Sequence, residues 1–100
     1  MNVRYAQLLK AVYELANRCR KDTINVSSSY FIAKATSELG DVFVDYDTTI
    51  DNTSFWLIHT EYDEFGFTSA TATASKLDDL GVDPNTIQWR CLKLWKLDVM

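Results

Sequence analysis

The stretch Asp41-Val42-Phe43-Val44-Asp45-Tyr46-Asp47 decides the fold class, because here the chain takes up the periodicity of a β-strand. Its apolar residues at positions 42, 44 and 46 fall on one side of an extended chain. Positions 43, 45 and 47, two of them aspartates, fall on the other side. The alternation predicts a half-buried strand whose carboxylates face water.

The chain that follows predicts two further strands. Ser54–Tyr62 is apolar on both sides at its start, which is typical of a central strand, and a turn is expected before it around Ile50-Asp51-Asn52-Thr53. Asp63-Glu64-Phe65-Gly66 is expected to form a four-residue hairpin connection, with Gly66 supplying a positive φ. Phe67–Thr73 alternates with period two and is rich in threonine, which favours a strand.

The last third of the chain is expected to add a short helix and a final strand. The alternative to the strand Phe67–Thr73 is a helix that Ser69 caps and that ends before Gly81. The alternation favours the strand, followed by a helix from Ser75 to Leu80 that Gly81 closes. A turn is expected at Asp83-Pro84-Asn85. Ile87–Leu97 is interpreted as a buried strand, with a C-terminal helix as the alternative.

Two helices are predicted before the first strand. Apolar residues recur at helical spacing from about Val3 to Arg20, and Asn2 can cap this helix. A second helix is predicted from Ser28 or Ser29 to Leu39, because serine suits its start and Gly40 suits its left-handed end.

The order of these elements predicts an α+β fold with two N-terminal helices packed on a three- to four-stranded antiparallel sheet, and a short helix before the last strand. A length of 100 residues sets the expectation of one compact domain, residues 1–100. No stretch resembles an export signal or an apolar membrane span, so a cytoplasmic protein is expected. Cys19 and Cys91 form no C-x-x-C motif and are expected to be buried and reduced.

The sequence contains no recognisable motif for catalysis, metal binding or nucleotide binding, so we expect neither enzymatic activity nor a cofactor. His59 is the only histidine, and no local motif places a nucleophile beside it. One histidine and two distant cysteines do not make a zinc site. A calcium loop beginning at Asp45 would have Ile50 at the glycine position and Trp56 at the glutamate position.

Charge is distributed unevenly along the chain. Residues 1–39 contain six basic and three acidic residues, whereas residues 40–83 contain one basic and ten acidic residues. The acidic residues between positions 41 and 64 are the candidate partner-binding residues: Asp41, Asp45, Asp47, Asp51, Glu61, Asp63 and Glu64. Neighbouring like charges cost stability, so their presence indicates a surface for a basic partner. The alternative is that they only keep exposed strands soluble.

These observations favour a non-enzymatic protein-binding module that presents an acidic face to a basic protein. In the narrower form of this hypothesis, the partner is a nuclease or another nucleic-acid-binding protein that the module inhibits, as small phage anti-defence proteins do. One alternative is a winged-helix-like nucleic-acid-binding domain, although its acidic hairpin would repel phosphates. Another is a homo-oligomer subunit that associates through the aromatic C-terminal segment around Trp89 and Trp95.

Overall fold

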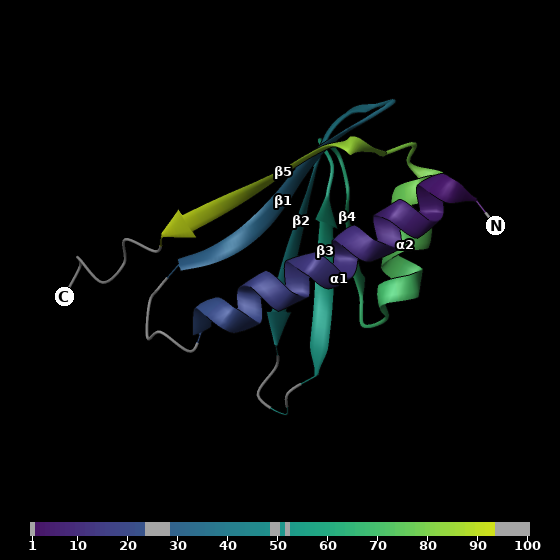
Figure 1. The fold of residues 1–100 in the computed structure, drawn as a ribbon. Coiled ribbons are helices and arrows are strands. Elements are labelled where there is room, and N and C mark those ends of the chain that lie inside the picture. Colours follow the sequence, from purple (N-terminus) through teal and green to yellow (C-terminus); the bar gives the residue numbers. More distant parts are fainter. Residues whose placement is uncertain (1, 24–28, 49–50, 52, 94–100) are drawn as a thin grey trace.

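The computed structural model describes residues 2–23, 29–48, 51 and 53–93, with side-chain positions for residues 2–19, 32–48, 51 and 53–90. Two helices and five strands follow one another in the order α1-β1-β2-β3-β4-α2-β5 (Figure 1). The helices are α1 (Val3–Thr23) and α2 (Ala70–Asp79). The strands are β1 (Ser29–Ser37), β2 (Gly40–Thr48), β3 (Ser54–His59), β4 (Glu64–Phe67) and β5 (Asp83–Lys93). The α+β class is confirmed.

The five strands form one antiparallel sheet in the order β4-β3-β2-β1-β5. The sheet is therefore larger than the three or four strands expected. Both helices lie on the same face: α1 crosses β1, β2 and β5, and α2 packs on β3 and β4 (Figure 1). The opposite face carries no helix or strand within the residues that the structure describes.

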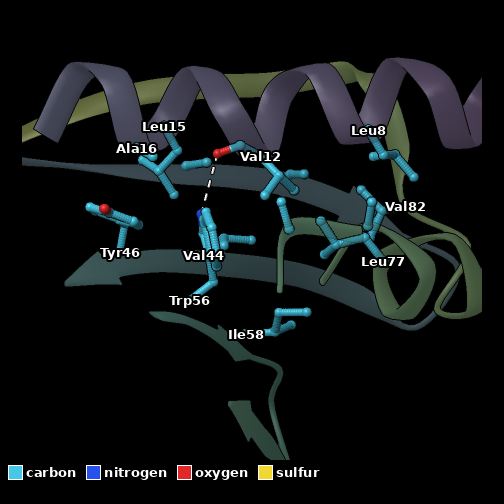
Figure 2. Close-up of a cluster of buried hydrophobic side chains, with 14 of the residues drawn as sticks. Leu8, Val12, Leu15, Ala16, Val44, Tyr46, Trp56, Ile58, Leu77 and Val82 are labelled. Carbon is cyan, nitrogen blue, oxygen red and sulfur yellow. Dashed lines mark hydrogen bonds between the residues drawn. The ribbon is translucent and has the colours of Figure 1, made fainter. Parts of the chain in front are cut away.

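The hydrophobic core lies between the two helices and the sheet. Figure 2 shows apolar side chains of α1 facing Val44 and Tyr46 of β2 and Trp56 and Ile58 of β3. The Nε1–H of Trp56 donates a hydrogen bond to the main-chain carbonyl of Val12 at 3.2 Å, so the polar N–H of the indole has a partner inside the core. Cys19 is buried here as expected, and the side chain of Cys91 lies outside the described part of the chain.

The first helix is confirmed, and it extends to Thr23. The Oδ1 of Asn2 accepts a hydrogen bond from the main-chain N–H of Arg4 at 2.8 Å, which is the capping contact that the sequence predicts. On the helix, Leu8, Val12 and Leu15 are almost fully buried at spacings of three and four residues.

The predicted second helix, from Ser28 or Ser29 to Leu39, is wrong, because this segment contains strand β1. Ala33 and Ala35 are buried, whereas the residues between and beside them are not, which is the period of a strand. β1 pairs with β2 on one side and β5 on the other, and this tertiary pairing outweighs the local capping signal. Gly40 has a φ of +118° and serves the β1–β2 hairpin instead of a helix end.

The predicted strand Phe67–Thr73 is also wrong, and the alternative helix capped by Ser69 is correct. The Oγ of Ser69 accepts a hydrogen bond from the main-chain N–H of Ala72 at 3.2 Å. The buried side of α2 consists of Ala70, Thr73, Ala74 and Leu77, which follow helical spacing. Gly81 has a φ of +73° and closes the helix as expected.

The connection between β3 and β4 lies at Thr60–Asp63, three residues before the predicted one. The main-chain N–H of Thr60 donates to the carbonyl of Asp63 at 2.9 Å and closes this turn. Glu64 and Gly66 are therefore strand residues, and Gly66 does not supply the predicted positive φ. Its role is a close approach instead, since a Cβ there would lie 3.3 Å from a side-chain atom of Leu57.

The turn predicted at Asp83-Pro84-Asn85 appears as a bulge in β5. Thr36 of β1 pairs with Asp83, whereas Lys34, only two residues away, pairs with Gln88. The residues between positions 83 and 88 are left out of the regular ladder. The final strand is confirmed as far as Lys93, and the rest of the predicted segment, residues 94–97, lies outside the described residues.

Candidate partner-binding surface

The sheet face opposite the helices carries four of the seven predicted site residues. Along β2, Val42, Val44 and Tyr46 are buried against the helices, so Asp41, Asp45 and Asp47 lie on the other face. Glu64 of β4 lies on this face too, because it pairs directly with His59 of β3. The prediction that the carboxylates of β2 point away from the core is therefore confirmed.

His59 lies between two of these carboxylates. Its Nε2 is 2.8 Å from Oδ2 of Asp45, and its Nδ1 is 2.9 Å from Oε2 of Glu64. Phe43 is the direct partner of His59, so Asp45 is a diagonal neighbour and Glu64 a direct one. An imidazolium donates to both carboxylates, whereas a neutral imidazole has one N–H and donates to only one.

This arrangement joins three neighbouring strands on the outer face of the sheet. Both ring nitrogens of His59 face a carboxylate, one on β2 and one on β4. No group of histidine, cysteine and acidic residues suited to a metal ion occurs among the described residues. Oδ1 of Asp45 is buried and has no hydrogen-bond partner among the described residues. This carboxylate is therefore held through Oδ2, which contacts His59.

Two turns at one end of the sheet carry strongly exposed apolar side chains. Leu39, in the β1–β2 turn, is 78% exposed, and Tyr62, in the β3–β4 turn, is 85% exposed. Because Phe43 pairs with His59, both turns leave the sheet at the same end, which is the upper end in Figure 1. Two strand spacings, about 10 Å, separate them along the sheet.

These turns and the neighbouring strand ends define a surface that we call the acidic end. Tyr62 lies directly between Glu61 and Asp63, and Asp41 and Glu64 are the first carboxylates on the adjoining strands. The side chains of Asp41 and Glu64 are 56% and 61% exposed. The acidic end consists of Leu39, Asp41, Glu61, Tyr62, Asp63 and Glu64.

The predicted site residues thus separate into two groups. Asp41, Glu61, Asp63 and Glu64 belong to the acidic end. Asp45 lies beside it, because His59 contacts both Asp45 and Glu64. Asp47 pairs with Phe55 near the other end of β2, and Asp51 follows in the β2–β3 connection. Leu39 and Tyr62 were not predicted, because their exposure depends on where the two turns fall.

Few cations offset the charge of the acidic end. Lys34 Nζ lies 3.7 Å from Oδ2 of Asp41, a partly exposed ion pair that contributes little stability. Within the described residues, no ion pair joins Glu61 or Asp63 to a basic side chain. These two carboxylates flank Tyr62 and remain available to a partner.

Comparison with known proteins finds no matching family model, no similar curated protein and no similar solved structure. Among the described residues, no helix is long and apolar enough to cross a membrane. The winged-helix alternative requires the second predicted helix as its recognition helix, and that segment contains strand β1. The oligomer alternative depended on the aromatic residues Trp89 and Trp95. Trp89 is partly buried, and the Arg18 guanidinium lies 4.8 Å from its ring centroid. Trp95 lies outside the described residues.

Proposed function

We propose that this protein is a non-enzymatic binding module that docks its acidic end on a basic surface of another protein. The observation that supports this proposal best is the exposure of Tyr62 between Glu61 and Asp63. Tyrosine is enriched among the residues that dominate binding energy at interfaces. A tyrosine surrounded by carboxylates fits an apolar pocket with lysine or arginine at its rim.

Leu39 gives the surface a second apolar contact. It lies on the neighbouring turn, so a partner that receives Tyr62 would also cover Leu39. The carboxylates around these two side chains would attract basic partners at a distance and disfavour acidic ones. In this proposal the two apolar side chains supply affinity, and the carboxylates supply selectivity.

Nucleic-acid-binding proteins are the partner class that fits this charge best, because their binding grooves concentrate lysine and arginine. Docked in such a groove, the acidic end would occupy the positions of phosphates and inhibit nucleic-acid binding. This narrower proposal requires that nucleic acid and the module compete for one partner.

The experiment compares wild-type protein with two variants that change the same amount of charge at opposite ends of the sheet. Glu61→Lys with Asp63→Lys alters the acidic end, and Asp47→Lys with Asp51→Lys alters the opposite end. Each immobilised protein is exposed to lysate, retained proteins are identified, and the dissociation constant is measured with the purified partner. We expect a basic partner to bind the wild type and the Asp47/Asp51 variant, and to bind the Glu61/Asp63 variant at least about tenfold more weakly.

Equal binding of the partner to all three proteins would show that the acidic end is not the docking surface. For the narrower proposal, duplex DNA and single-stranded RNA are added to the complex at moderate ionic strength. Release of the module by either nucleic acid supports inhibition by mimicry. A complex that neither displaces is a protein–protein interaction of another kind.

A further inference from the structure

Strand β5 forms one edge of the sheet and is bound to β1 on one side only. No strand in the described part of the chain pairs with its other side. The N–H and C=O groups of an edge strand form a template for a further strand. β5 has eleven residues and β4, at the other edge, has four, so β5 is the longer template.

The first half of β5 cannot extend the sheet regularly. Pro84 has no N–H to donate, and the N–H of Asn85 donates to Oδ1 of Asp83 at 2.9 Å. The regular ladder with β1 begins at Gln88 and continues to Lys93. These six residues span about 20 Å, which is enough for a short extended peptide.

An open hollow lies beside this edge on the helix side of the sheet. Its volume is about 390 Å³, and α1 and β5 line it, with Lys10 and Arg18 on the helix and Ile87 and Trp89 on the strand. The Arg18 guanidinium lies over the Trp89 ring, and Arg18 Nε is 3.1 Å from Oε2 of Glu14. A strand added along residues 88–93 would meet this hollow at Trp89, the residue of that stretch in the described lining, and would direct side chains toward it there.

The charge around the edge is opposite to that of the acidic end. Lys10 and Arg18 face the hollow, and Arg90, which pairs with Ile32, is exposed on the other side of the sheet. Glu14 is the one acidic residue in the lining of the hollow. An incoming strand would therefore meet Arg90 on one face, and two basic residues and one acidic residue of α1 on the other, a balance that favours acidic side chains.

We propose that the edge of β5 from Gln88 to Lys93 binds an extended acidic segment of another protein by adding it to the sheet as a sixth strand. A second copy of this chain fits less well, because β5 between Gln88 and Lys93 contains no acidic residue to meet this positive charge. This inference does not depend on the proposed function of the acidic end, which lies at a different place on the molecule.

The experiment titrates the protein with three acetylated, amidated hexapeptides and follows binding by fluorescence anisotropy. The first alternates glutamate with valine, the second alternates lysine with valine, and the third is the glutamate peptide with alternate amides N-methylated. We expect the glutamate peptide to bind at least about tenfold more tightly than the other two. Hydrogen exchange should show new protection of alternate β5 amides between residues 88 and 93.

Two variants separate this site from the acidic end. Lys10→Glu with Arg90→Glu should weaken binding of the glutamate peptide at least about tenfold, whereas Glu61→Lys with Asp63→Lys should leave it within roughly twofold. Equal binding of the N-methylated peptide would overturn strand addition, and equal binding of the lysine peptide would overturn the preference for acidic segments. Failure of the glutamate peptide to bind, or a wild-type dimer whose β5 amides are already protected, would overturn the proposal.

Discussion

His59 and Asp45 are joined across strands β3 and β2 by a contact of 2.8 Å between Nε2 and Oδ2. Both side chains are about one-third exposed, so solvent weakens the interaction. Glutamine in place of His59 has one nitrogen, so it cannot face both Asp45 and Glu64 as the two ring nitrogens do. We expect His59→Gln to lower the free energy of unfolding by about 1 kcal/mol, measured by urea denaturation at neutral pH.

A double-mutant cycle with Asp45→Asn isolates the contact itself. The coupling between the two positions should be about 0.5–1 kcal/mol and should fall as salt is added. Asp47→Asn is the control, because Asp47 lies on the same strand and face and makes no contact with His59. Additive effects of the His59 and Asp45 substitutions would mean that the contact contributes nothing.

Substitutions at Ser69 and Ser75 test which of these two serines caps α2. Ser69→Ala removes the acceptor for the N–H of Ala72 and should destabilise the protein by about 1 kcal/mol. Ser75 is exposed inside the same helix, where alanine is the better helix former. Ser75→Ala should therefore stabilise by roughly 0.3–0.5 kcal/mol, as measured by thermal or urea unfolding. Similar effects of the two substitutions would contradict the assignment of the cap.

The side chain of Glu38, in the β1–β2 turn, lies against Gly81 at the end of α2. A Cβ at Gly81 would lie 2.8 Å from both Cγ and Cδ of Glu38, and the φ of +73° is unfavourable for alanine. We expect Gly81→Ala to lower the free energy of unfolding by about 1–3 kcal/mol. Shortening Glu38 to alanine in the same protein should recover part of this loss, because it removes the steric contact and leaves the backbone strain.

Gly40 is the comparison for that substitution. Its φ is +118°, but a Cβ there would meet nothing within 4 Å. Glu38→Ala should therefore recover less of the cost of Gly40→Ala than of Gly81→Ala, in unfolding experiments under identical conditions. If Glu38→Ala rescues both glycine substitutions equally, the steric contact at Gly81 is not the cause.

The sequence predicts those elements whose burial pattern is local. α1 and β2 are correct because each buries one side against a single layer, so the apolar period is visible within the segment. β1 was predicted as a helix because its small and polar residues carry little periodic signal. Its conformation depends on pairing with β2 and β5, and β5 begins 46 residues later in the chain than β1 ends.

The candidate surface was predictable in part for the same reason. Parity along β2 places Asp41, Asp45 and Asp47 on the outer face without knowledge of the neighbouring strands. The contact of His59 with Glu64 depends on the register between β3 and β4. That register was not predicted, because the turn between these strands was placed three residues too late. Tyr62 occupies the tip of that turn, so its exposure became visible only when the turn was placed at Thr60–Asp63.

The proposed roles of the residues at the acidic end lead to a kinetic prediction. Exposed carboxylates at the rim of an interface act mainly on the association rate, whereas a buried aromatic anchor acts mainly on the dissociation rate. We expect Glu61→Gln with Asp63→Asn to slow association with the basic partner several-fold and to reduce its dependence on salt. Tyr62→Ala should leave association nearly unchanged and should speed dissociation at least about tenfold.

Surface plasmon resonance at several ionic strengths measures both rates for each variant. Tyr13→Ala is the control, because Tyr13 is an exposed tyrosine on α1 and lies on the opposite side of the sheet from the surface charges of β2. It should change neither rate. If Tyr62→Ala affected association alone, the tyrosine would take part in the first encounter only, and the anchor would have to lie elsewhere, with Leu39 as the next residue to replace.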